Sequence, residues 1–213
     1  FRDALYSVLS QSYKDIEIIV IDDGSSEDIK KEIIDKGVTY VRQENRGAPA
    51  ARNRGLELAK GDYVIFWDAD VVADPQMLKK LKKQLDKSPD ASFAYCNYNF
   101  GLKKMSAQSF DTEKLKQNNL IHTTSLIHKK EMVRWDESLK RFQDWDLWLS
   151  MVDREKKGVW VDEYLFLVGS GGTMSGWLPK IAYKKPWKFL PGVRSKVKKY
   201  EEAKNLVKRK HNI

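Results

Sequence analysis

The chain has 213 residues, of which 41% are hydrophobic and 32% are charged. This length and this balance are typical of one globular domain and argue against a disordered chain. No apolar run approaches the roughly 20 residues that a membrane-spanning helix requires.

Two features bear on location. The single cysteine, Cys96, excludes an internal disulfide and favours a reducing compartment. The first residues already form an amphipathic segment without the charged and apolar regions of a signal peptide. We therefore expect a cytoplasmic protein, with at most a peripheral position at the cytoplasmic face of a membrane.

Charge is distributed unevenly along the chain. Residues 177–213 contain ten Lys, two Arg and two Glu, a net charge of +10, whereas the whole chain carries +9. Residues 1–176 are therefore nearly neutral. This division predicts a catalytic or binding body, residues 1–176, followed by a basic, aromatic C-terminal extension, residues 177–213.

Segments with helical periodicity alternate with short β-branched runs that are typical of buried strands. In chain order, the sequence predicts a helix at 1–13, a strand at 16–21, a helix at 29–36, a strand at 38–42, a helix at 48–60, a strand at 62–67 and a helix that begins at Asp74. Such alternation predicts an α/β fold in which a mostly parallel sheet is flanked by crossover helices.

Acidic residues follow two of the predicted strands. Asp22 and Asp23 end the first strand, and Asp68 and Asp70 follow the third. In open parallel sheets, ligands bind at the carboxyl ends of the strands, so we expect both clusters on one rim. Two carboxylates one residue apart can bind a divalent cation whose shell is completed by phosphate oxygens. A plain turn is the alternative, because Asp also favours turns.

Three ordered motifs carry a family resemblance: DIEIIVIDDGSSED (15–28), ENRGAPAARNRGLELAKGDYVIFWDAD (44–70) and DESLKRFQDWDLWLSM (136–151). In this order and at these separations they resemble the nucleotide-sugar glycosyltransferases of family 2, which have the Rossmann-like GT-A fold. The resemblance covers residues 1 to about 176. Family members usually begin with a strand that packs on the nucleotide base, so we expect that this N-terminal strand is missing here.

The resemblance implies a role for each matching residue. It implies a nucleotide-sugar donor, most simply UDP-linked, and a divalent metal, Mn²⁺ or Mg²⁺, held by Asp70 and Asp68. The catalytic base that it implies is Asp144. The residues expected to bind the donor are Asp23, Asn45, Gly47, Arg52, Asn53 and Asp68.

These residues also have structural interpretations. Asp23 could end a strand, and Arg52 could be a solvated charge on a helix. Asp144 and Asp146 stand where a helix should begin, and a helix N-terminus stabilises negative charge. The two histidines of segment 122–128 are expected to be structural rather than ligands.

The expected mechanism follows from the two faces of the reacting sugar. In an inverting transfer the acceptor hydroxyl attacks opposite the leaving diphosphate, so a base is needed on one face and charge neutralisation on the other. Asp144 and a metal at Asp68 and Asp70 would supply these parts. The sequence thus predicts transfer to a carbohydrate or lipid-linked acceptor in polysaccharide, glycolipid or cell-surface glycan synthesis.

The chain departs from the family pattern at three places. Val71 and Gln143 stand where many relatives have acids, and residues 168–177 contain no histidine, where many relatives have a metal ligand. Ser170 or the loop backbone could replace it. The small residues of 169–176 predict either a mobile loop that closes over the donor or an ordinary linker.

The basic extension first interleaves aromatic residues with lysines and then becomes helical. The aromatic residues are Trp177, Trp187 and Phe189, and the apolar face of the helix comprises Val193, Val197, Tyr200 and Val207. This composition suits an interfacial helix beside an anionic membrane. A helix docked on its own domain explains it equally well.

Three other functions stay open. A nucleotidyltransferase that acts on sugar phosphates would also use metal-bound acids at the rim of an α/β sheet. An inactive glycosyltransferase-like fragment would keep the motifs without the activity. The basic extension alone would suit nucleic-acid binding, but the near-neutral body argues against it.

Overall fold

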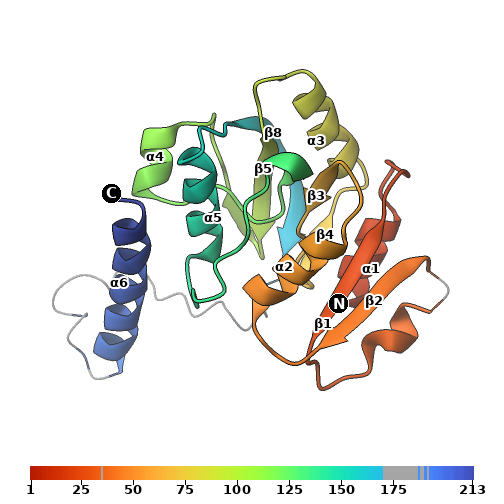
Figure 1. Cartoon of the computed structure of the whole chain (residues 1–213), viewed down its shortest axis with the longest axis horizontal. Helices are drawn as coiled ribbons and strands as arrows, with labels where there is room; N and C mark the ends of the chain where they lie inside the picture. Colours follow the sequence, from red (N-terminus) through yellow and green to blue (C-terminus); the bar gives the residue numbers. More distant parts are fainter. Residues whose placement is uncertain (35, 170–186, 188–189, 191) are drawn as a thin grey trace.

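The computed structural model describes residues 1–34, 36–169, 187, 190 and 192–213. Its strands form two sheets (Figure 1). In the smaller sheet, β1 (Ile18–Asp23) and β2 (Val38–Gln43) run parallel. The larger sheet has the order β3-β7-β5-β8-β4, with β6 paired to β5. Its strands are β3 (Tyr63–Ile65), β4 (Val71–Ala73), β5 (Phe93–Phe100), β6 (Lys103–Met105), β7 (Leu126–His128) and β8 (Gly158–Val168).

Helices cover both faces of the larger sheet. The α-helices of the described residues are α1 (Arg2–Leu9), α2 (Ala48–Leu58), α3 (Met77–Asp86), α4 (Thr112–Gln117), α5 (Gln143–Val152) and α6 (Val193–Lys210). Short 3₁₀ helices lie at Ile29–Glu32 and Lys129–Glu131. In Figure 1, α3 and α5 lie on opposite sides of β5.

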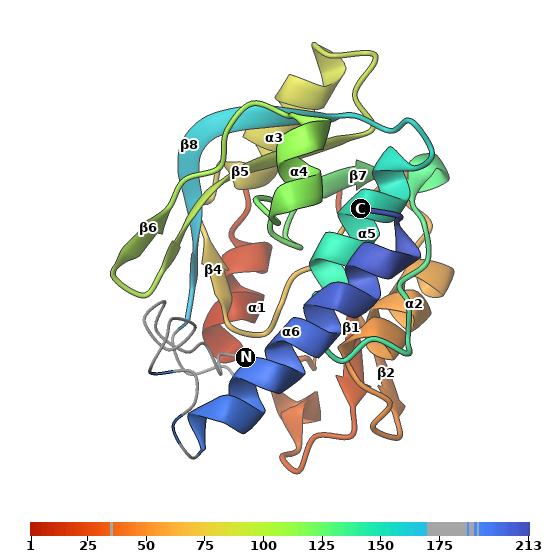
Figure 2. The same cartoon turned by 90° about the vertical axis from the view of Figure 1, so that its left-hand side faces the viewer.

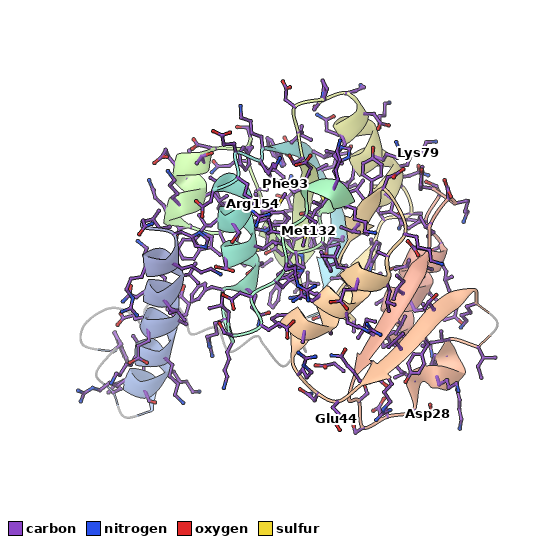
Figure 3. All side chains as sticks on the ribbon, viewed as in Figure 1. Asp28, Glu44, Lys79, Phe93, Met132 and Arg154 are labelled. Atoms are coloured by element: carbon purple, nitrogen blue, oxygen red, sulfur yellow. The ribbon has the colours of Figure 1, made fainter. Side chains whose placement is uncertain are left out.

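β5 separates two parts of the core. Ala94 and Cys96 pack with the apolar side chains of α3, whereas Phe93 and Tyr95 pack with those of α5. The ring of Phe93 lies 4.7 Å from that of Trp148, and Figure 3 shows Phe93 in the interior. Successive side chains of a strand point to opposite faces, so a strand buried on both sides requires this continuous apolar run.

The α/β class is confirmed, but the larger sheet is mixed rather than mostly parallel. The pairs β1–β2 and β5–β8 are parallel, and the other pairs of the larger sheet are antiparallel. Gly101 has a φ of 55°, and here the chain reverses after β5 instead of crossing over. β6 therefore returns beside β5, and β7 also enters antiparallel to β5.

The helix expected at 29–36 is a short 3₁₀ helix, Ile29–Glu32. The side chain of Asp28 caps it by accepting the backbone N–H of Lys30 at 3.1 Å. In this region Ile33 is buried, but the residues of the 3₁₀ helix are not. The expected helix thus lacks the packed apolar face that stabilises most helices in proteins.

A cavity of about 1090 Å³ lies between β1 and β3. β1 pairs with β2 and β3 pairs with β7, and no other described strand pairs with either of them. Apolar side chains of these strands and of α1 and α2 line the cavity, among them Ile19, Ile21, Val64, Leu5 and Leu56. The same cavity reaches Asp22 and Asp68. The two sheets are thus separated by a largely apolar space.

α6 is docked on the body of the molecule. Figure 2 shows it alongside α5, and Val207 belongs to the same buried cluster as Trp148. Val197 is also buried, so the apolar face of the helix points toward the protein. The sequence left open whether this helix lies at a membrane or is docked on its own domain, and the structure shows that it is docked on the domain. Within the described residues, no helix has both the length and the apolar character that crossing a membrane requires.

Candidate active site

The acid pair lies in the loop that joins β3 to β4. The backbone N–H of Val71 donates to the Asp68 carbonyl at 3.0 Å, and the indole N–H of Trp67 donates to the Val71 carbonyl at 2.9 Å. The Asp70 carbonyl accepts the N–H of Gly169, at the end of β8, at 2.9 Å. These bonds fix the backbone that carries both carboxylates.

Arg52 connects three elements at this loop. From α2, its Nη2 donates to Asp68 Oδ1 at 2.7 Å, and its Nη1 donates to Gln143 Oε1 of α5 at 3.3 Å. The guanidinium also lies 4.6 Å from the ring of Trp135. Only 13% of the Arg52 side chain is exposed, so it is part of the packed structure rather than a solvated charge.

The two acids of the pair differ in their electrostatic environment. Burial disfavours the charged form of Asp68, but Arg52 and His122 more than offset this effect and hold its pKa below the ordinary value. Burial and the negative charge of Asp68 raise the pKa of Asp70. A bound cation would relieve this repulsion between the two carboxylates.

Asp144 lies in the first turn of α5 and is held by Asn119. Nδ2 of Asn119 donates to Asp144 Oδ2 at 2.7 Å, while Oδ1 of Asn119 accepts the N–H of Ile121 at 3.1 Å. The N–H of Trp145 donates to Asp144 Oδ1 at 3.1 Å. Burial raises the pKa of Asp144. Sequence analysis missed Asn119, since 25 positions separate it from its partner and no local pattern marks the pair.

His122 has the contacts of a packed core residue. Its ring centroid lies 4.8 Å from that of Tyr98 and 5.0 Å from that of Phe166. Its Nδ1 accepts the N–H of Thr124 at 3.0 Å, and burial lowers its pKa. In the part of the chain that the structure describes, no three His, Cys, Asp or Glu side chains are arranged to hold a metal.

Asp23 organises the loop that leads into α2. Its carboxylate accepts the N–H groups of Arg46 at 2.9 Å and Gly47 at 2.7 Å. Gly47 has a φ of 90°, which favours glycine. Asn45 belongs to the same loop and lies against Gly24, where a Cβ would come within 3.0 Å of the Asn45 nitrogen. Asp23, at the end of β1, therefore holds the loop after β2 that contains Asn45 and Gly47.

The buried acid of the first cluster is Asp22, which is 2% exposed. It accepts the hydroxyl of Tyr40 at 2.7 Å, the guanidinium of Arg42 at 3.1 Å and the N–H of Ser25 at 2.7 Å. Asp22 and Ser25 line the cavity that also reaches Arg52 and Asp68. One cavity thus connects the end of β1 to the acid pair.

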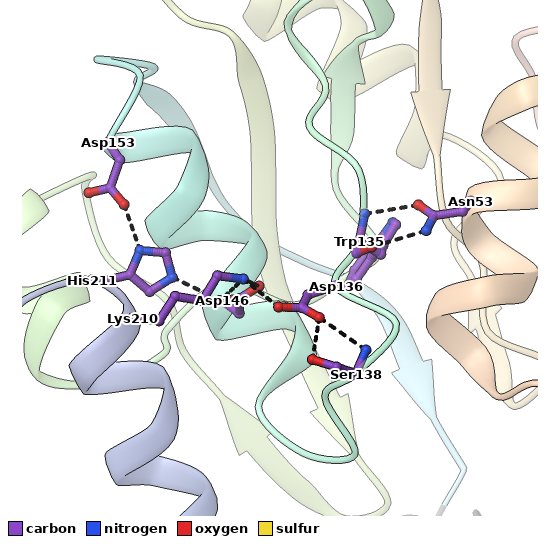
Figure 4. Close-up of polar contacts among 8 residues, drawn as sticks. All are labelled: Asn53, Trp135, Asp136, Ser138, Asp146, Asp153, Lys210 and His211. Carbon is purple, nitrogen blue, oxygen red and sulfur yellow. Dashed lines mark hydrogen bonds and ion pairs between the residues drawn. The ribbon is translucent and has the colours of Figure 1, made fainter.

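Asn53 joins α2 to the loop that precedes α5. Its Nδ2 donates to the Trp135 carbonyl at 3.0 Å, and its Oδ1 accepts the Trp135 N–H at 2.9 Å (Figure 4). Nδ2 also donates to Glu137 Oε1 at 2.9 Å. Asn53 is buried, and these contacts are structural.

The structure therefore brings together Arg52, Asp68, Asp70 and Asp144 from α2, the β3–β4 loop and α5. Of the other sequence features, Val71 is fully buried in β4. Ser170 and the rest of segment 170–176, together with Trp177 and Phe189, lie outside the described residues.

This arrangement of sheets and helices is that of the GT-A fold. Residues 1–349 of Staphylococcus aureus TarS, solved in complex with UDP-GlcNAc, match with a TM-score of 0.69 at 17% identity, over 82% of this chain and 56% of that one. The Pyrobaculum calidifontis mannosyltransferase PcManGT, solved with GDP-Man and Mn²⁺, matches with a TM-score of 0.61 at 16% identity, over 82% of this chain and 54% of that one.

The chain belongs to glycosyl transferase family 2, whose model matches residues 1–143. A Bacillus subtilis relative, the glycosyltransferase TuaG assigned to teichuronic acid biosynthesis, is 33% identical over 163 residues, which is 74% of this chain and 58% of TuaG. The chain spans 52% to 63% of the length of four curated relatives, TuaG among them.

Proposed function

We propose that this chain is the catalytic part of an inverting glycosyltransferase that moves a sugar from a nucleotide-diphosphate sugar to a hydroxyl acceptor. One observation carries the proposal: Arg52 of α2 binds Asp68 and also contacts α5, where Asp144 lies. The acids needed on the two faces of the sugar would thereby share one site. Family membership supports a nucleotide-sugar donor.

We also propose UDP as the nucleotide and surface glycan as the product. TarS was solved with UDP-GlcNAc, and TuaG is assigned to the synthesis of a teichuronic acid. Both chains extend well beyond the part that matches this one. The acceptor would be a carbohydrate or a lipid-linked carbohydrate.

On the donor side, the end of the cavity that Asp22, Ser25 and Asp68 line would take the nucleoside. The diphosphate would lie at Asp68 and Asp70, with Arg52 holding Asp68 in place. Asp23, together with the loop of Asn45 and Gly47 that it holds, would form one wall of the base pocket. Asn53 would hold α2, which carries Arg52, against the loop before α5.

The residues of the acid pair fit a hard divalent cation, Mn²⁺ or Mg²⁺. Such ions bind one or two carboxylates and take further oxygens from water and from substrate phosphates, so two protein ligands are sufficient. Asp70 and Asp68 would hold the ion, which would neutralise charge on the diphosphate leaving group. The Mn²⁺ of PcManGT supports this assignment.

On the acceptor side, Asp144 would act as the base. It would take the proton of the acceptor hydroxyl while the new bond forms between that oxygen and the anomeric carbon. The bond from the anomeric carbon to the diphosphate oxygen breaks with its electron pair on the diphosphate. Attack from the opposite side inverts the configuration. Asn119 bonds Oδ2 of Asp144, and among the contacts described above Oδ1 accepts only the backbone N–H of Trp145.

The cavity between the sheets would also admit an extended segment. We propose that an N-terminal strand belongs between β1 and β3, where it would join the two sheets into one. Residues 1–176 and this strand would make up the GT-A domain, with residues 177–213 as the extension.

The exposed face of α6 would give the protein peripheral contact with an anionic membrane. Its buried face, with Val197 and Val207, is already used, so the contact would be electrostatic and would weaken as salt shortens the Debye length. Binding to anionic vesicles that exceeds binding to neutral ones, and falls with salt, is the expected result. Equal binding to both kinds of vesicle would contradict it.

The central test is thermal unfolding with UDP and Mn²⁺, separately and together. If metal and diphosphate share a site, the two together should raise the unfolding temperature more than the sum of their separate shifts. Asp70→Asn should remove this excess, and an unchanged excess would remove the metal role. Release of pyrophosphate from a nucleoside triphosphate and a sugar phosphate would instead identify a nucleotidyltransferase.

A further inference from the structure

Asp146 is the second acid of the Asp-Trp-Asp motif, and it faces the C-terminal helix. Sequence analysis treated it as an acid at a helix N-terminus, but the structure leaves only 2% of it exposed. Nζ of Lys210 lies 2.9 Å from its carboxylate, and Nε2 of His211 lies 2.8 Å from its Oδ1 (Figure 4). Its buried carboxylate thus bonds two residues, Lys210 and His211.

The same two residues reach further along α5 and into the loop before it. Nδ1 of His211 lies 2.5 Å from Asp153 Oδ2, at the C-terminal end of α5. Nζ of Lys210 donates to Asp136 Oδ2 at 2.7 Å. The residue before Asp136 is Trp135. Asn53 of α2 bonds both the backbone carbonyl and the backbone N–H of Trp135. The end of the chain therefore connects α5 to the loop that α2 also holds (Figure 4).

A second set of contacts lies at the beginning of α5. Phe142, the residue before the helix, has a φ of 59°, a conformation that is costly for a residue other than glycine and needs support from its surroundings. The ring of Tyr200 in α6 packs edge-on against Phe142, with centroids 4.9 Å apart. Lys204 of α6 lies over the ring of Trp145 at 5.8 Å. α6 and His211, the residue after it, thus contact the residues that flank α5 and, within its first turn, Trp145 and Asp146.

The geometry of a helix connects these contacts to the site. Residues two positions apart in an α-helix are separated by about 200° around its axis, so Asp144 and Asp146 point to nearly opposite sides of α5. Asp144 is held by Asn119, and Asp146 is held by α6. A shift of α5 toward or away from α6 would therefore move the carboxylate of Asp144.

We propose that Lys210 and His211, acting through Asp146, are positioning residues for the transfer reaction. They hold the first turn of α5 so that Asp144 stands at the correct distance from the Arg52–Asp68 pair. The proposal rests on the proposed function in one respect, which is the role of Asp144 as the base. Lys210 and His211 would thus contribute to the rate of transfer but not to the binding of the donor.

The test compares Lys210→Met with Lys210→Arg and with Lys199→Met. Lys210 is the safest position to change, because 38% of its side chain is exposed, whereas Asp146 and His211 are buried. Lys199 lies on the same helix, is exposed and receives the same substitution as a control. Lys210→Arg keeps the charge and can bridge both carboxylates.

At a temperature at which every variant is folded, Lys210→Met should lower the maximal transfer rate about 10- to 100-fold, the usual effect of a misplaced catalytic group. KM for the donor should stay within about twofold, since the donor site does not involve α6. Lys210→Arg should keep most of the rate, and Lys199→Met all of it. A wild-type rate for Lys210→Met, or an equal loss in the Lys199→Met control, would overturn the proposal.

A second measurement separates this proposal from the proposed function. Hydrogen exchange of the backbone amides in the first turn of α5 should become faster in Lys210→Met and not in Lys199→Met. The effects of Asp146→Asn and Lys210→Met on this exchange should be less than additive, because both changes remove the Lys210–Asp146 ion pair. Unchanged exchange in Lys210→Met overturns the positioning role even if the wild-type protein transfers sugar. Absence of transfer by the wild-type protein with all donors tested overturns the proposed function instead.

Discussion

The guanidinium of Arg52 lies 2.7 Å from the Asp68 carboxylate and 3.3 Å from the side-chain oxygen of Gln143, the residue before Asp144. One side chain therefore joins the loop of the proposed diphosphate site to the helix of the proposed base. Gln143 is the α5 partner in this contact. It also donates its Nε2 to the Leu139 carbonyl at 2.9 Å, which fixes its orientation.

Arg52→Lys should weaken binding of UDP with Mn²⁺ about tenfold, although the charge is kept. A lysine offers a single ammonium and cannot contact Asp68 and Gln143 as a planar fork while lying against Trp135. Isothermal titration calorimetry would measure the change. Arg54→Lys, at an exposed pair with Glu57 on the same helix, is the matched control and should bind like the wild type. Equal affinities for all three proteins would show that Arg52 does not organise the donor site.

Asp144→Asn should separate binding from turnover. The amide keeps the size of the carboxylate but cannot take a proton, so transfer should fall by roughly 10²-fold or more while UDP affinity stays nearly intact. Radiolabelled-sugar transfer and calorimetry would give the two quantities. A loss of affinity that matches the loss of rate would mean that Asp144 belongs to the donor site and is not the base.

Asp146→Asn cannot serve as the control for this change, because Asp146 is buried and bonded to Lys210 and His211. Asp86→Asn, at a surface pair with Lys82, is a better control and should leave both quantities unchanged. Since burial raises the pKa of Asp144, the wild-type rate should rise with pH through a midpoint above the ordinary range for Asp.

Asp136 should stabilise the folded protein at neutral pH and lose this contribution in acid. Hydrogen bonds from Lys210 and Ser138 lower the pKa of Asp136 to about 2. A carboxyl whose pKa is lower in the folded state stabilises the fold above its unfolded value of about 3.9 and loses this contribution as pH falls toward 2. Asp136→Asn should therefore cost ~1 kcal/mol near neutral pH and less near pH 3. Urea denaturation at several pH values would test this, and a cost that does not vary with pH would contradict it.

The cavity between β1 and β3 should accept an added strand. A version of the protein with an apolar, β-branched segment before Phe1, which lines the cavity, should unfold at a higher temperature and bind UDP more tightly. The strand would fill apolar space and pair with two open strand edges. An extension of equal length made of Gly and Ser is the control. Identical unfolding temperatures and affinities for both extensions would remove the proposed strand.

The sequence by itself determined the elements that depend on local pattern. The expected strands 16–21 and 38–42 overlap β1 and β2, and the expected helix 48–60 overlaps α2, because periodicity and turn chemistry act over a few residues. Motifs of this kind also identified the family. The exception, the helix expected at 29–36, failed because helix formation needs a packed apolar face, which the local sequence cannot supply.

Only the tertiary structure decided the partners of the polar residues. Asn53 bonds Trp135 across 82 positions, and Lys210 bonds Asp146 across 64. No local pattern encodes such pairs, so two acids that are two positions apart receive different partners: Asn119 bonds Asp144, and α6 buries Asp146. The burial of Asp146 follows from where α6 docks, since an unpaired buried charge is costly and only the folded chain provides its partners.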